Sequence, residues 1–93
     1  MNAASINDTA ITAAILALTQ ALGPDRSICP SDAAQALAVE WRPLLGPVRR
    51  VAARLAQDGH IDILRKGKPI DAAQMKGVIR LRMRATPPAA DPA

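Results

Sequence analysis

The chain has 93 residues, of which 49% are hydrophobic and 22% are charged, and its net charge is +4. This length allows one domain with a modest core, and the balance of apolar and charged residues excludes an intrinsically disordered chain. Phe and Tyr are absent and Trp41 is the single aromatic residue, so the core is expected to be aliphatic.

The positive charge is unevenly distributed along the chain. Residues 1–41 contain one arginine and four acidic residues, a net charge of −3. Residues 42–84 contain eleven arginines and lysines against three aspartates, a net charge of +8. Such asymmetry favours a polyanionic partner for the second half. The alternative is that the charge serves only to keep the protein soluble, as in many small basic proteins.

The number of cysteines and the length of the apolar runs bear on where in the cell the protein is expected. Cys29 is the only cysteine, so no disulfide can form within the chain, and a cytoplasmic location is expected. The first residues lack the basic segment of a signal peptide. The longest apolar run is much shorter than the roughly 20 residues that a membrane span needs, so no membrane association is expected.

The first predicted element is an amphipathic helix over residues 8–22. Its apolar residues recur at three- and four-residue steps. Gly23 and Pro24 end it, because glycine suits the position after a helix and proline cannot continue one. Residues 1–7 are expected to be frayed.

A short strand and a second helix are expected next. Residues 25–30 form a short strand at most, because Pro30 prevents a longer one. Ser31 is the expected N-cap of a helix over residues 32–40. Trp41 then begins a connection rich in proline and leucine, where a single tryptophan is more often a core residue than a partner-binding anchor.

The stretch from Gly46 to Lys68 is the most informative part of the chain. It predicts a third helix that starts at Pro47 and runs to Asp58. At 3.6 residues per turn, one side of this helix is apolar and is expected to be buried. That side consists of Val48, Val51, Ala52 and Leu55, and the opposite side carries Arg49, Arg50, Arg54 and Gln57.

After Gly59 the apolar period changes from 3.6 to 2, which is typical of strands. The predicted elements are a strand over residues 60–65, a turn over 66–69, a loop over 70–77, a strand over 78–84 and a disordered tail over 86–93. In the last strand Ile79, Leu81 and Met83 are expected to face inward, and Arg80, Arg82 and Arg84 outward. Three like charges in one row repel one another unless an anion lies across them, but they also keep a surface soluble.

The order of these elements indicates an α+β fold over residues 8–85. Three helices and a small antiparallel sheet with a wing hairpin make a winged helix-turn-helix. A family of small bacterial winged-helix domains of unknown function has similar sequence blocks. The blocks that carry this resemblance are RSICPSDAAQAL, WRPLLGPVRR, LRKGKPID and KGVIRLRM. The resemblance implies the winged-helix fold and, by analogy of fold alone, nucleic-acid binding.

Double-stranded DNA is the partner that this fold and charge favour. The third helix would enter the major groove, where arginine is the best reader of guanine. Arg49, Arg50 and Arg54 are the expected base-reading residues, and Gln57, near the helix end, is expected to contact a phosphate or nothing. The expected backbone contacts of the wing are Arg65, Lys66 and Lys68.

Two other functions remain open from the sequence. The first is a protein-interaction adaptor, in which the basic face meets an acidic protein surface or Trp41 and the wing form the contact. The second is RNA binding by shape through the same charge. A single small module would act as a monomer or a weak homodimer.

We expect no enzymatic activity, cofactor or metal. The chain has one histidine, His60, and one cysteine, Cys29, which cannot complete a zinc site. Asp58, Asp62 and Asp71 form no evident acid/base pair, and the sequence contains no glycine-rich phosphate loop and no nucleophile motif.

Overall fold

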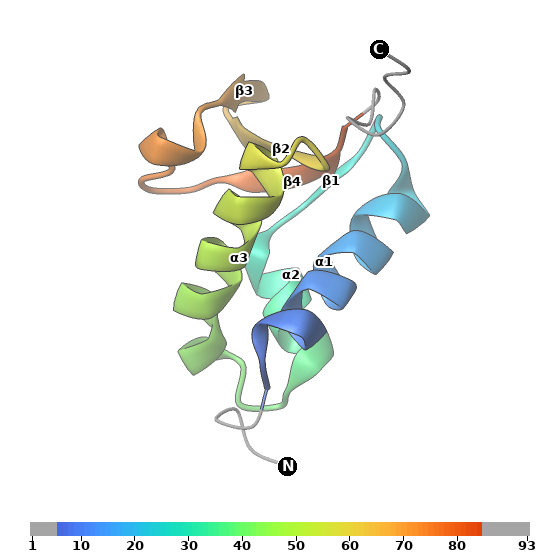
Figure 1. Cartoon of the computed structure of the whole chain (residues 1–93), viewed down its shortest axis with the longest axis vertical. Helices are drawn as coiled ribbons and strands as arrows, with labels where there is room; N and C mark the ends of the chain where they lie inside the picture. The colour runs from blue at the N-terminus through green and yellow to red at the C-terminus, as the bar shows by residue number, and fades with distance from the viewer. Residues whose placement is uncertain (1–5, 85–93) are drawn as a thin grey trace.

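The computed structural model describes residues 6–84 and has the expected α+β architecture (Figure 1). Three helices lie on one side of a four-stranded antiparallel sheet whose strand order is β1-β4-β2-β3. A hairpin joins β2 and β3, and the whole arrangement is consistent with a winged helix. The elements are α1 (Asp8–Leu22), β1 (Ser27–Ile28), α2 (Pro30–Leu37), the 3-10 turn η2 (Arg42–Leu44), α3 (Leu45–Gln57), β2 (Ile61–Arg65), β3 (Lys68–Ile70), the 3-10 turn η3 (Ala72–Gln74) and β4 (Arg80–Met83).

Helix α1 has the bounds that the sequence predicts. The side chain of Asn7 caps its first turn by accepting a hydrogen bond from the Ala10 N–H at 2.9 Å. Gly23 ends it with a φ of 77°, a left-handed conformation that glycine adopts without strain. Ile6 packs against the core and Asn7 caps the helix, so the expectation that these two residues are frayed is wrong. Residues 1–5 and the expected disordered tail, residues 86–93, lie outside the described residues.

Helix α2 starts earlier than its sequence pattern predicts, and the prediction of Ser31 as its N-cap is wrong. The N-cap is Cys29, whose backbone N–H donates to the Asp32 carboxylate at 2.9 Å. Pro30 takes the first helical position, where its missing N–H and fixed φ suit the helix. The helix also ends earlier, at Leu37.

Helix α3 buries the side that its periodicity predicts. Its buried residues are Val48, Val51, Ala52 and Leu55. The helix begins at Leu45, directly after η2, and Pro47 lies in its first turn. Proline costs no hydrogen bond there because the first four N–H groups of a helix have no partner within it.

The wing is a tighter hairpin than the expected four-residue turn. Lys66 and Gly67 have φ values of 52° and 81°, as a two-residue type I′ turn requires. Lys68 and Pro69 therefore belong to β3, with Lys68 opposite Arg65 and Pro69 opposite Leu64. Proline fits here because β3 is an edge strand that pairs with β2 alone.

Arg80 and Arg82 of β4, and Arg84 directly after it, are held by groups of neighbouring strands, and the carboxylate that meets two of these arginines is Asp62 of the same chain. The Asp62 carboxylate accepts hydrogen bonds from Arg82 at 3.1 Å and Arg84 at 3.0 Å. Arg80 instead donates to the Ser27 hydroxyl and carbonyl at 2.6 and 2.9 Å. These contacts join β4 to its two neighbouring strands, β2 and β1.

The core between the helices and the sheet is aliphatic, as expected. Its fully buried large side chains include Ile11 and Ile15 of α1, Val48 of α3, Ile61 and Ile63 of β2 and Leu81 of β4. Thr19 is also buried, and its hydroxyl donates to the Ile15 carbonyl at 2.8 Å, so this polar group is paired. Trp41 is half-buried against this core, and the Arg42 guanidinium lies 4.5 Å from its ring centre.

The packing of α3 generates a stability prediction. Leu55 is 6% exposed, so Leu55→Asp would bury a carboxylate without a partner and is expected to remove at least about 4 kcal/mol of unfolding free energy. Chemical denaturation followed by circular dichroism measures this loss. Gln57→Asp adds the same charge at an exposed position of the same helix and is expected to cost less than about 1 kcal/mol. Equal stability of the two variants would contradict the orientation of α3.

Candidate nucleic-acid interface

The solvent-facing side of α3 is the first part of the candidate interface. Arg50, Arg54 and Gln57 are exposed along it. Figure 1 shows α3 at one side of the molecule, with the β2–β3 hairpin and η3 beyond its C-terminal end.

Arg50 has a carboxylate partner at the surface. Its guanidinium lies 2.7 Å from an Asp8 carboxylate oxygen, and the two side chains are 60% and 43% exposed. An exposed pair of this kind contributes only about 0–1 kcal/mol. A phosphate can therefore replace Asp8 at little cost. Within residues 6–84, Arg54 has no salt bridge.

Arg49 has a different position from the other two arginines of α3. It is half-buried, and its guanidinium donates to the Met75 carbonyl at 2.5 Å. This contact spans 26 residues and fastens α3 to the segment between β3 and β4. The fold thus places Arg49 where it positions a loop.

Arg65 makes the matching contacts from the wing side. It is half-buried at the end of β2, and it donates to the carbonyls of Gln74 and Lys76 at 2.5 and 2.6 Å. Together Arg49 and Arg65 bind three consecutive carbonyls, those of residues 74–76. These hydrogen bonds join α3, the wing and the β3–β4 segment. The positive charges of the two arginines are not neutralised, because carbonyl oxygens carry only partial charge.

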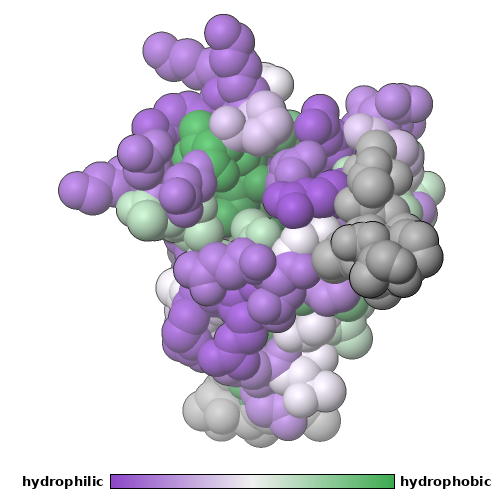
Figure 2. Space-filling view, turned by 45° about the horizontal axis from the view of Figure 1, so that its top comes forward, coloured by the Kyte–Doolittle hydropathy of each residue, from purple (hydrophilic) through white to green (hydrophobic). Residues whose placement is uncertain are grey.

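The wing turn supplies the second exposed part of the interface. Lys66 and Lys68 are exposed on either side of Gly67. The structure adds Lys76, an exposed cation in the β3–β4 segment that sequence reasoning missed because the pattern there predicted only a loop of uncertain form. Figure 2 shows hydrophilic side chains projecting around apolar surface at the sheet end of the molecule.

Features of a metal site or a membrane span are not found in the residues that the structure describes. This part of the chain contains no group of three or more His, Cys, Asp or Glu side chains that could hold a metal ion. Cys29 lies beside Arg80, with 3.0 Å between Sγ and the guanidinium, whereas His60 lies near the other end of β4. Among residues 6–84 no helix has the length and apolar character to cross a membrane.

The Arg65 contacts predict a local effect. Arg65→Gln shortens the side chain and removes its charge, so the segment over residues 74–78 is expected to open more readily by roughly 1–2 kcal/mol. Amide hydrogen exchange should then be about 5–30 times faster in that segment alone. Lys66→Gln is the matched control because Lys66 is exposed. Unchanged exchange in Arg65→Gln would contradict the positioning role.

Comparison with known proteins shows the family to which the chain belongs. A search of curated proteins finds no match. A family model matches residues 8–84, which run from the first residue of α1 to the residue after β4. The match covers the helices, the wing and the β3–β4 segment that the two arginines hold. The chain therefore belongs to the family described as "Protein of unknown function (DUF3253)".

Proposed function

We propose that this protein binds double-stranded DNA, with the exposed side of α3 in the major groove and the wing on the phosphate backbone. The observation that carries the proposal is the exposure of Arg50 and Arg54 on the third helix of a winged-helix arrangement. Arginine donates in a fork that fits guanine and phosphate oxygens. The same helix faces the core with its other side, so these arginines cannot turn inward.

The distribution of charge supports the proposal. Residues 42–84 carry a net charge of +8, and within them only Asp62 forms salt bridges with arginines of the same segment. Lys66, Lys68 and Lys76 extend the positive surface from α3 to the wing. Contacts of this kind release counterions from DNA and give affinity with little sequence information.

The seven residues expected from the sequence then divide into two roles. Arg50, Arg54, Lys66 and Lys68 are exposed and are the proposed direct contacts, with Gln57 beside them. Arg49 and Arg65 are proposed to act by holding the β3–β4 segment in place. A regulator of transcription is the role that such a protein would serve, acting as a dimer on a symmetric site or as a weakly binding monomer.

The decisive variant removes both exposed arginines of α3. Arg50→Ala with Arg54→Ala is expected to weaken binding of a random-sequence DNA duplex at least about tenfold. The slope of log affinity against log salt should also fall by about 0.9 for each phosphate that the variant no longer neutralises. Fluorescence anisotropy at several salt concentrations measures both quantities. The melting temperature should stay nearly unchanged because both side chains are exposed.

Arg26→Ala is the matched control. Arg26 is an exposed arginine in the turn between α1 and β1, outside α3 and the wing, so its removal changes the net charge without touching the proposed surface. It should bind DNA nearly as the unmodified protein does. Unweakened binding by the double variant would contradict the role of α3, and stronger binding of an RNA duplex or of an acidic protein would support the alternative functions instead.

A further inference from the structure

A groove opens where the wing separates from β4. The pairing of β2 with β4 ends at Leu64 and Arg80. Beyond that pair, β2 continues into the wing turn, whereas the chain before β4 leads away toward η3. The space between the two diverging segments is a groove of about 520 Å³. Its lining residues are Ser27, Leu64, Arg65, Lys66, Gly67, Lys76, Gly77, Val78 and Arg80.

The groove has an apolar floor and an uncovered apolar rim. Leu64 is 5% exposed but does not belong to the core cluster, because its side chain points to the sheet face opposite Ile63. Val78, at the rim, is 86% exposed. Exposed apolar surface beside a buried apolar floor is the composition of a ligand site, and the groove volume falls within the roughly 300–1,000 Å³ of small-molecule pockets.

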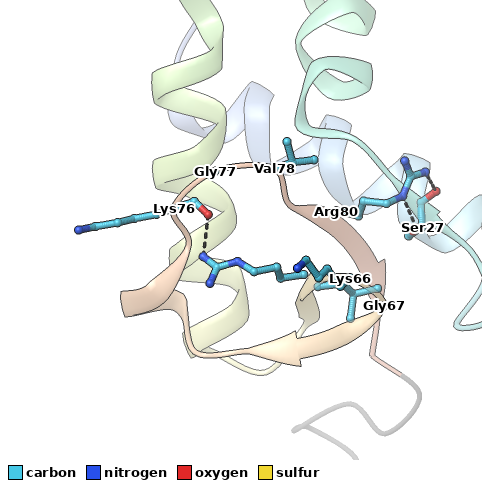
Figure 3. Close-up of a pocket in the computed structure, with 9 residues that line it drawn as sticks. Ser27, Lys66, Gly67, Lys76, Gly77, Val78 and Arg80 are labelled. Carbon is cyan, nitrogen blue, oxygen red and sulfur yellow. Dashed lines mark hydrogen bonds between the residues drawn. The ribbon is translucent and has the colours of Figure 1, made fainter.

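The polar lining of the groove is cationic. Figure 3 shows Lys66 and Gly67 across the space from Gly77 and Val78, with the Lys76 side chain extending away. Arg65 and Arg80 form walls, but their guanidinium groups donate to the segment around Lys76 and to Ser27. Lys66 has no salt bridge in the described part of the chain, so its ammonium group remains for a ligand.

The walls of the groove are held in place without a ligand. Arg65 ties the wing to the carbonyls of Gln74 and Lys76, and Arg80 ties β4 to Ser27. A ligand therefore enters a formed site and avoids most of the cost of ordering it. The positive charge of the lining favours an anionic ligand. The apolar floor favours an anion that also has a hydrocarbon part.

We propose that this groove binds a small organic carboxylate whose apolar body lies on Leu64 and Val78 and whose carboxylate meets Lys66. The lining and the volume of the groove support this proposal whether or not the protein binds DNA. Lys66 is also one of the proposed DNA-backbone contacts, so the groove and the proposed DNA surface share this residue.

The test is a titration of the full, ¹⁵N-labelled chain with sodium 4-phenylbutyrate, followed by amide chemical shifts. Saturable shifts are expected at Gly67, Gly77 and Val78. Val78→Ser is expected to weaken the affinity about fivefold because the ligand then buries less apolar surface, and Lys66→Gln by a similar factor because the ammonium partner of the carboxylate is removed. Both side chains are exposed, so both variants should fold.

Two controls match these variants closely. Val39→Ser changes a valine that is 94% exposed outside the groove, and Lys68→Gln removes a wing charge that does not line it. Both should bind 4-phenylbutyrate as the unmodified chain does, and 4-phenylbutylamine, which has the opposite charge, should not saturate the site. Absence of saturable shifts, equal binding of the amine, or equal weakening in the control variants would each overturn the proposal.

Discussion

Burial of the apolar side of α3 sets how the helices pack on the sheet and which side chains reach the surface. Val48 and Ala52 are fully buried, and Val51 and Leu55 are nearly so. Each large aliphatic side chain buried in this way contributes roughly 1.5–3 kcal/mol. A core without phenylalanine or tyrosine needs many such contacts. The rotation of α3 that satisfies them turns Arg50 and Arg54 outward, so the same packing that stabilises the fold also exposes its positive charge.

Two pairs of arginines in this protein show how the type of hydrogen-bond partner decides whether the positive charge is offset. Arg82 and Arg84 meet the Asp62 carboxylate, which offsets part of their charge within the sheet. Arg49 and Arg65 donate to backbone carbonyls of residues 74–76, which hold the side chains without cancelling their charge. Positive potential therefore persists around α3 and the wing, and the hydrogen bonds that retain it also shape the groove between the wing and β4.

Local patterns in the sequence predicted the local parts of this fold. The bounds of α1 and the buried side of α3 follow from periodicity and end signals within one segment. The start of α2 was mistaken because Ser31 is a good cap by composition, whereas Pro30 at the first helical position and Asp32 facing the Cys29 N–H favour an earlier start. The strand β3 was missed: Lys68 and Pro69 were assigned to the turn and Ile70 to the loop, because proline is typical of turns, although an edge strand tolerates it.

The remaining features depend on contacts between distant segments. Arg49 reaches a carbonyl 26 residues away, and Asp62 meets arginines 20 and 22 residues away. No periodicity or motif predicts such pairs. The sequence therefore identified the basic residues, but it did not show which of them are exposed to solvent and which position a loop. The groove likewise arises where Leu64 and Arg80 end a pairing, which only the register reveals.

Titration of the protein with a DNA duplex, followed by amide chemical shifts, would show whether DNA lies along the exposed side of α3. If the orientation of α3 sets the function, the largest shifts should occur at the amides of Arg50, Arg54 and Gln57, followed by those of the wing turn. Gln35 and Ala36, exposed on α2, should be unaffected. Shifts centred on α2 with none on α3, or no shifts at low salt, would rule out DNA binding by the exposed side of α3.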